Sequence, residues 1–270
     1  MRIFSTIILV LLLLTSCQTR EIHPQQPVSR GSRWPQPRDN NKKEIFLDHG
    51  YFQISYDETI RLPNWVSYQL KAENLKKKSA KRRNRFFADP LLQQRQVAFV
   101  KPTDYDGDQY DRGHMAPSDD FAWDQAANDA TFVMSNMAPQ SRALNRGSWK
   151  KLEGIIRKWA CTEGELRVVT GPIFGTSFVK MSTQVPIPPR FFKVVLDETP
   201  PRKAIGFIYM QEDARSQVQE KAVSIAEVEQ LTGYRFFLDL KQSEREPIEN
   251  NYNFKSWVET DCLPSKKKGS

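Results

Sequence analysis

Short apolar stretches, separated by Gly, Pro, Asn and Asp, follow one another along the chain from residue 50 onward. Their length and their β-branched and aromatic residues predict β-strands. Trp149, Leu152, Ile156 and Trp159 instead recur at the spacing of an amphipathic helix. Strands outnumber helices and do not alternate regularly with them, so the pattern predicts an α+β fold rather than a doubly wound sheet. The predicted strands cover residues 50–56, 63–70, 97–100, 131–137, 166–170, 190–196 and 204–210, and a second helix covers 223–231.

The N-terminus is typical of a targeting signal, with Arg2 followed by an apolar run over residues 3–14 that is too short to cross a bilayer comfortably. The run ends in Leu-Thr-Ser-Cys, which resembles a bacterial lipobox and predicts cleavage before Cys17 and acylation of that cysteine. An ordinary secretory signal with an incidental Cys17 is the alternative. No aspartate follows Cys17, which favours the outer membrane and leaves its periplasmic and surface faces both open. The chain thus divides into a signal peptide (1–16), a flexible tether rich in Pro, Gln, Arg and Ser (17–43), one domain (44–262) and a basic tail (263–270).

Positive charge is concentrated in one segment. The formal charge of +8 falls to +7 when residues 1–16 are removed, because Arg2 is the one charged residue there. Residues 71–85 alone hold eight basic side chains against one acidic side chain. Such a run is typical of a polyanion-binding surface, although a solvated loop has the same composition. The expected nucleic-acid-binding residues are Lys76, Lys77, Lys78, Arg83 and Arg85.

Two cysteines, Cys161 and Cys262, remain once Cys17 is assigned to the lipid. In an oxidising compartment they could pair, and two free thiols are the alternative. Neither lies in a CxxC pattern, so the sequence carries no zinc-ribbon signal.

The chain has three histidines, and His114 is the one beside Asp, Arg and Gly, in Tyr-Asp-Arg-Gly-His-Met-Ala-Pro at 110–117. Arg112 can hold a phosphate bidentately, and Gly113 allows a close backbone approach. A histidine has a reference pKa of about 6.5, so it is largely neutral near pH 7 and can accept a proton from water. We therefore expect His114 to act as a general base that acid inactivates. A buried loop histidine paired with a carboxylate is the alternative.

Asn145 begins the predicted amphipathic helix, and Glu153 follows eight residues later. On one continuous helix Glu153 lies about 12 Å further along the axis, and its side chain leans back toward Asn145. Mg²⁺ suits this sparse set of oxygen ligands because it keeps several of its waters. The spacing predicts an ion held by Asn145 and reached by Glu153 through water. The alternatives are an N-cap role for Asn145 and a solvated helix face for Glu153.

Six motifs in the same order resemble the DNA/RNA non-specific endonuclease family, the ββα-metal, endonuclease G-like nucleases. The resemblance runs from about residue 50 to residue 240. It implies a ββα-metal nuclease fold in which helices flank a central, mainly antiparallel sheet. The motifs are Tyr-Asp-Arg-Gly-His-Met-Ala-Pro (110–117), Ser-Asn-Met-Ala-Pro-Gln (135–140), Leu-Asn-Arg-Gly-Ser-Trp-Lys-Lys-Leu-Glu (144–153), Val-Val-Thr-Gly-Pro-Ile-Phe (168–174), Pro-Pro-Arg-Phe-Phe-Lys-Val-Val-Leu (188–196) and Leu-Thr-Gly-Tyr-Arg-Phe-Phe (231–237).

The resemblance implies a metal-assisted site. His114 is then the general base that activates water. Asn145 is the only direct protein ligand of a Mg²⁺ ion, with Mn²⁺ as the alternative metal. Glu153 and Asp111 bind the water shell of the ion.

The same resemblance implies three supporting roles. Asn136 orients the loop that carries the histidine, and Arg112 supports the phosphate side. Arg82 is the expected stabiliser of the transition-state charge, although Arg83 and Arg85 lie in the same stretch.

The implied activity is hydrolysis of phosphodiester bonds in DNA and RNA with little base discrimination. A non-catalytic nucleic-acid-binding lipoprotein is the main alternative, but it would not need His114, Asn145 and Glu153 together. A phosphodiesterase acting on small molecules or lipids is a third interpretation, and the local basicity favours a long polyanion instead. No sequence feature points to a protein inhibitor or a homodimer, and both stay open.

Overall fold

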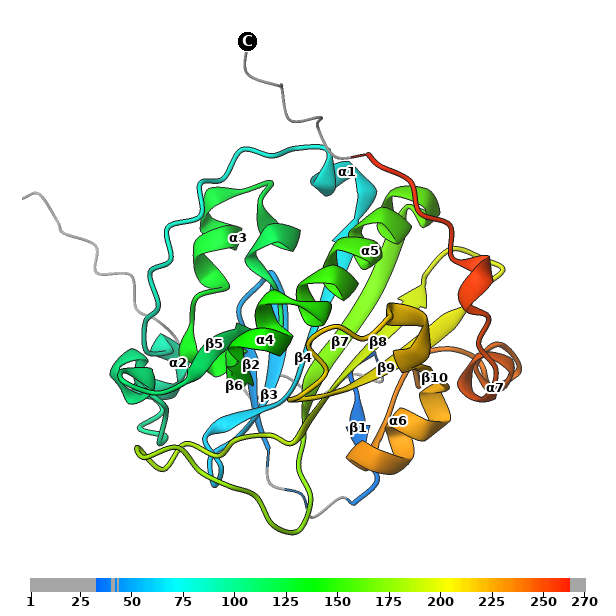
Figure 1. The fold of residues 1–270 in the computed structure, drawn as a ribbon. Helices are drawn as coiled ribbons and strands as arrows, with labels where there is room; N and C mark the ends of the chain where they lie inside the picture. Colours follow the sequence, from blue (N-terminus) through cyan, green and yellow to red (C-terminus); the bar gives the residue numbers. More distant parts are fainter. Residues whose placement is uncertain (1–32, 40–41, 43, 263–270) are drawn as a thin grey trace, which may run out of the picture.

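A seven-stranded sheet forms the centre of the computed structural model, which describes residues 33–39, 42 and 44–262 (Figure 1). The strand order is β10-β9-β8-β7-β4-β3-β2, and every neighbouring pair is antiparallel. The predicted α+β class with a mainly antiparallel sheet is therefore confirmed. The strands are β2 (Ile45–Asp48), β3 (Phe52–Asp57), β4 (Leu62–Lys71), β7 (Glu165–Ile173), β8 (Arg190–Asp197), β9 (Ala204–Met210) and β10 (Ala222–Val223).

Helices cover both faces of this sheet, which explains why β4, β7 and β8 are buried at nearly every position. Along β8, Phe191 and Val195 pack toward α5, whereas Phe192 and Val194 pack toward α6. The α-helices are α1 (Ala72–Leu75), α2 (Pro90–Gln94), α3 (Gln125–Ala130), α4 (Arg142–Arg146), α5 (Ser148–Glu163), α6 (Ile225–Thr232) and α7 (Gln242–Asn250). Short 3₁₀ turns are η1 (Pro102–Tyr105), η2 (Ser118–Phe121), η3 (Met134–Asn136), η4 (Val218–Lys221) and η5 (Phe254–Ser256).

A separate two-stranded antiparallel sheet carries the histidine motif. It consists of β5 (Tyr110–His114) and β6 (Met137–Ser141), with Gly113 opposite Ala138. A Cβ atom on Gly113 would collide with the buried Gln140 side chain, so the expected close backbone approach is present. The motif was expected in a loop because its mostly polar residues lack the period-two alternation of a strand.

Two predicted strands are wrong. Residues 97–100 are irregular, and Val100 fills the core without joining a sheet. Of residues 131–137, the first six form a turn, an isolated bridge at Val133 and η3, and β6 begins only at Met137. The predicted stop at Gly171 is also wrong, because β7 continues to Ile173; Gly171 is needed there because a Cβ atom would collide with the Asn64 carbonyl.

Residues 33–39 correct the expected boundary between tether and domain. Strand β1 (Gln36–Pro37) pairs with β11 (Tyr234–Arg235), and the ring of Trp34 lies 6.2 Å from that of Phe46. This part of the expected tether is therefore packed on the domain. The signal peptide, Cys17, most of the rest of the tether and the basic tail lie outside the described residues. Within the described part of the chain, no helix has the length and apolar character needed to cross a bilayer.

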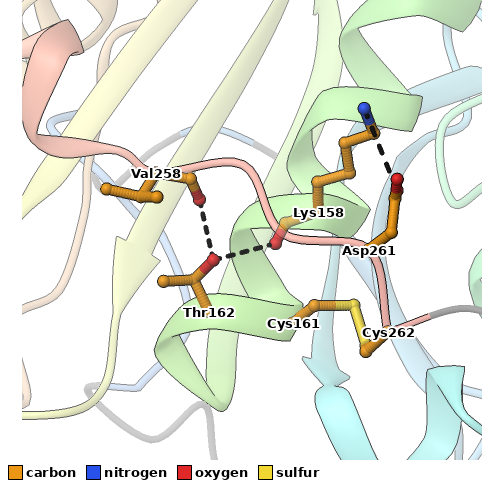
Figure 2. Close-up of a disulfide and its surroundings, with 6 residues drawn as sticks. All are labelled: Lys158, Cys161, Thr162, Val258, Asp261 and Cys262. Atoms are coloured by element: carbon orange, nitrogen blue, oxygen red, sulfur yellow. Dashed lines mark hydrogen bonds and ion pairs between the residues drawn. A yellow bond between two sulfur atoms is a disulfide. The ribbon is translucent and has the colours of Figure 1, made fainter.

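A disulfide joins Cys161 to Cys262 across a sequence separation of 101 residues, as the first of the two alternatives anticipated (Figure 2). It fastens the C-terminal segment to the end of α5. The Thr162 hydroxyl donates to the Val258 carbonyl at 2.8 Å and supports the same junction. The chain after α7 is thus attached to the helix that also carries Glu153.

We expect Cys262→Ser to lower the free energy of unfolding by about 2–5 kcal/mol, because the cross-link restricts the unfolded chain over a long loop. Urea unfolding under oxidising conditions measures this difference. Reduced wild-type protein serves as the matched control and should unfold like the variant. Equal midpoints for oxidised and reduced wild type would contradict a stabilising role.

Candidate active site

One cleft brings together the site residues that the motifs predict. It is a cavity of about 780 Å³ lined by residues of β5, α4 and α5 together with residues of the neighbouring loops. The predicted residues that line it are Arg82, Asp111, Arg112, His114, Asn145 and Glu153. The predicted phosphate-binding residues Lys76, Lys77, Lys78, Arg83 and Arg85 do not line it.

His114 lies at the end of β5 and is enclosed by aromatic rings. It is 8% exposed, and its ring centroid lies 5.8 Å from that of Phe86 and 5.0 Å from that of Phe132. Its Nε2 atom has no hydrogen-bond partner among the described residues. Burial, reinforced by the positive charge of Arg82, lowers the pKa of His114 from 6.5 to about 3. The histidine is therefore neutral well into the acid range, which corrects the expectation built on its reference pKa.

Asn136 holds the backbone that follows the histidine. Its side-chain oxygen accepts a hydrogen bond from the Ala116 N–H at 2.9 Å, and its amide nitrogen donates to the Ala116 carbonyl at 2.9 Å. The same nitrogen donates to the Thr131 carbonyl at 2.8 Å. Asn136 is fully buried, so these bonds are shielded from water. These contacts fix the backbone just after His114, as the predicted role of Asn136 in orienting the histidine requires.

Arg82 is the arginine of the basic run that reaches the cleft. Its guanidinium donates to the hydroxyl of Ser118 and, at 2.7 Å, to the side chain of Asn84. Arg83 instead pairs with Asp129 at 2.9 Å, and neither Arg83 nor Arg85 lines the cavity. The geometry thus separates three arginines that the sequence left as alternatives.

Arg112 shapes one wall of the cleft. Its Nη2 atom donates to the carboxylate of Asp106 and to the Pro102 carbonyl, both at 2.8 Å. The guanidinium also lies 5.1 Å from the ring centroid of Phe86. Because these contacts engage the guanidinium, Arg112 fixes the loop around residues 102–106 beside the cleft.

The predicted continuous helix from Asn145 to Glu153 is wrong. Asn145 belongs to α4, whose N-cap is Ser141, and Gly147 separates α4 from α5. A Cβ atom on Gly147 would collide with the backbone carbonyl of Ala143. The N-cap alternative for Asn145 is therefore wrong as well.

Asp111 connects Asn145 to a basic wall that sequence reasoning missed. It accepts hydrogen bonds from Asn145 at 2.9 Å and from Arg146 at 2.8 and 2.7 Å. Partial burial opposes its ionisation, but the bonds from Arg146 and Asn145 outweigh that effect and lower the pKa of Asp111. Arg146 lines the cleft together with Arg142 and Lys150. Arg142 and Arg146 are four residues apart on α4, a spacing that places them on one helical face and could have found them, whereas Lys150 belongs to α5 and has no such signal.

Glu153 lies between the cleft and a buried polar cluster under α5. Burial raises the pKa of Glu153, and the nearby cations Lys193 and Arg157 oppose that shift. Lys193 is fully buried and donates to the hydroxyl of Thr170 at 2.7 Å. Arg157 pairs with the buried Asp120 at 2.8 Å. A solvated helix face, the alternative for Glu153, does not describe these surroundings.

The oxygen atoms of the cleft suit a hard divalent cation. The Asn145 amide nitrogen is engaged by Asp111, and the Asn145 side-chain oxygen accepts no hydrogen bond from the described residues. Together with Glu153 and Asp111, that oxygen forms a sparse set of neutral and anionic oxygens, which Mg²⁺ accepts because it retains water. No three His, Cys, Asp or Glu side chains of the described residues gather as a metal-ligand cluster.

Comparison with known proteins agrees with the motifs. The model of the family described as DNA/RNA non-specific endonuclease matches residues 36–243. The chain is 31% identical over 210 residues to a nuclease of Nostoc sp. (strain PCC 7120 / SAG 25.82 / UTEX 2576), covering 74% of this chain and 75% of that protein. It is 32% identical to nuclease C1 of Cunninghamella echinulata var. echinulata, covering 71% of this chain and 82% of that protein.

The solved structure of a complex between EndoG and EndoGI, described as showing the mechanism of EndoG inhibition, has a similar fold. The TM-score is 0.67 at 26% sequence identity, and the similarity covers 77% of this chain and 91% of that chain. Human mitochondrial endonuclease G is 34% identical over 160 residues, which is 54% of this chain and 52% of that protein.

The buried histidine makes stability depend on pH. Its folded pKa of about 3 lies below the unfolded value of 6.5, so between these values the unfolded state alone binds the proton. We expect wild-type protein without metal to lose about 2 kcal/mol more unfolding free energy than His114→Gln between pH 7.5 and pH 5. Urea unfolding at both pH values measures it. Parallel losses in the two proteins would show that His114 titrates normally.

Proposed function

The chain belongs to the DNA/RNA non-specific endonuclease family, and from this premise we propose that it is a magnesium-dependent endonuclease that hydrolyses phosphodiester bonds in DNA and RNA. The observation that carries the proposal is the meeting of a neutral, enclosed histidine, an arginine and an Asn-Asp-Glu oxygen set in one cleft. A protein that only bound nucleic acid would not need this combination.

The bound ion would lie against the side-chain oxygen of Asn145, with Glu153 and Asp111 reaching it through water. It supplies positive charge for phosphate oxygens and for the leaving oxygen. Mg²⁺ is our choice and Mn²⁺ the alternative, since both accept oxygen ligands. Asp111 already holds the Asn145 amide, which turns the amide oxygen away from that bond and leaves it available as a ligand.

His114 acts as the base toward the attacking water. Its Nε2 atom is buried without a hydrogen-bond partner among the described residues, so we assign proton acceptance to the other ring nitrogen, Nδ1. A phosphate entering beside Arg82 adds negative charge near the imidazole and offsets the arginine, which raises the pKa of His114 from its low value in the free protein. The base thus becomes stronger when substrate is present. Arg82 stabilises the charge that develops on the phosphate oxygens.

Weak base discrimination follows from the walls of the cleft. The basic side chains that line the cleft would recognise phosphates, which carry no sequence information. Arg142, Arg146 and Lys150 add to the binding residues that the sequence predicted. A DNA duplex and a folded RNA would then differ mainly in how their phosphate backbones enter the cleft.

We further propose that the enzyme works in the cell envelope, anchored to the outer membrane through lipid on Cys17. The lipobox-like sequence supports this proposal. The part of the tether before Arg33 would separate the anchor from the domain.

Incubation with supercoiled plasmid and with single-stranded RNA, each with Mg²⁺ or with EDTA, tests the enzymatic proposal. We expect both substrates to be cleaved in Mg²⁺ and neither to be cleaved in EDTA. His114→Ala should lower the cleavage rate by about 10²- to 10⁴-fold and keep nucleic-acid binding, since only the base is removed. Arg83→Ala, outside the cleft, is the matched control for Arg82→Ala, which should lower turnover. Binding without cleavage by the wild type would favour the non-catalytic alternative.

Cys17→Ala tests the anchor. We expect the variant to leave the membrane fraction and to keep its nuclease activity, because the acylated residue is separate from the cleft. Fractionation with N-terminal sequencing measures both the location and the cleavage of the signal. A correctly processed variant that still sediments with membranes would rule out lipid anchoring through this cysteine.

A further inference from the structure

A second, smaller cavity of about 120 Å³ adjoins the candidate active site. Lys77, Lys78 and Trp123 line it, and Asp119 lines both this cavity and the main cleft. The two cavities are therefore neighbours on one surface. We call the smaller one the annex.

Trp123 lines the annex, and Tyr51 does not line it but packs against Trp123. Trp123 is partly buried and packs on the core, while Tyr51 is 37% exposed at the turn between β2 and β3. Their ring centroids lie 6.0 Å apart in an edge-to-face arrangement. In this arrangement the two rings cover only part of each other's faces, so π-surface remains for a further flat ring.

The basic side of the annex is held in place by the backbone. The N–H groups of Ser79 and Ala80 both donate to the Ala122 carbonyl at 2.9 Å, and the Ser79 hydroxyl donates to the Trp123 carbonyl at 2.6 Å. In Figure 1 this segment is the cyan chain that leaves α1 and passes along α3. Lys77 and Lys78 are exposed, and within the described residues neither ammonium forms an ion pair. Their charge is therefore available to a ligand.

We propose that the annex binds an unpaired stretch of the nucleic-acid strand, with a base stacked on Trp123, whose ring Tyr51 supports, and phosphates at Lys77 and Lys78. The proposal rests on the proposed nuclease function. Bases offer their faces to aromatic side chains only when they are unstacked, so such a subsite selects single-stranded over duplex substrate. The carboxylate of Asp119, which lines both cavities, repels phosphate. The strand would therefore pass Asp119 with its bases, and not its phosphates, toward this residue.

The distance between the annex and Arg82 is short enough for one nucleic-acid strand to reach both. Lys78 precedes Arg82 by four residues, so their Cα atoms lie at most about 14 Å apart. A strand with its scissile phosphate beside Arg82 can therefore reach the annex within a few nucleotides. The annex then acts on affinity and substrate choice, while His114 and Arg82 act on the reaction.

Fluorescence anisotropy in EDTA tests this subsite without cleavage, with a labelled oligothymidylate and a duplex of the same length. We expect Trp123→Ala and Tyr51→Ala each to weaken binding of the single strand by about fivefold or more, with a much smaller effect on the duplex. Trp123→Phe should retain most of the affinity because it keeps an aromatic face. Tyr252→Ala removes a tyrosine of similar exposure, 42%, away from both cavities and serves as the matched control.

The lysines give a second readout. Exchanging Lys77 and Lys78 for Gln should reduce the log–log salt slope for the single strand by roughly 0.7 for each lost contact. Tyr51→Ala should leave that slope unchanged, since stacking releases no counterions.

If the aromatic variants lost equal affinity for the single strand and the duplex, or lost affinity for neither, the proposed role of the annex would be wrong. Wild-type cleavage of plasmid and RNA with Mg²⁺ identifies which proposal has failed. If the wild type cleaves but the aromatic variants show no selective loss, only the annex is wrong. If the wild type neither binds nor cleaves nucleic acid, the nuclease function and the annex fall together.

Discussion

The hydrogen bonds between the buried Asn136 amide and the Ala116 peptide are the interaction on which the site depends. They join the chain after β5 to the chain before β6, and so fix the exit of the strand that ends at His114. An amide side chain is suited to this task because it offers an acceptor to the N–H and a donor to the carbonyl of one residue, Ala116. A residue with an apolar side chain would leave the Ala116 N–H and carbonyl buried without partners, at a cost of about 1–3 kcal/mol for each group.

Charge is arranged in layers around the cleft. Basic and acidic side chains both line its walls, and Asp111 and Glu153 provide carboxyl oxygens in the cleft that Asn145 also lines. Beneath them, Lys193 and Arg157 keep positive charge close to Glu153 and Asp120 in a region closed to solvent. Removing one partner from such a buried set leaves an uncompensated charge, which is why the cluster constrains the position of α5 on the sheet.

Helix α5 connects this electrostatic arrangement to the rest of the fold. Its apolar face, with Trp149 and Trp159, packs on the central sheet, and its polar N-terminal turns supply Lys150 and Glu153 to the cleft. Its far end holds the C-terminal segment through the disulfide of Cys161. The same helix thus buries the core, presents the site and anchors the chain terminus.

Local sequence determined the chemistry and most of the sheet. The α+β class, the strands that became β3, β4, β7, β8 and β9, and six of the residues that line the cleft followed from short-range patterns and motifs. These signals are local because side-chain alternation and residue chemistry depend on near neighbours in the chain.

Tertiary structure alone decided which of the alternatives the chain adopts. The contact with Ser118, 36 residues away, distinguishes Arg82 from its neighbouring arginines. The disulfide depends on the meeting of Cys161 and Cys262, which are 101 residues apart. The low pKa of His114 comes from Phe86, Phe132 and Arg82, which enclose it from other segments. Such contacts depend on how the elements pack, and burial in that packing changes a group's electrostatics in a way that no local pattern encodes.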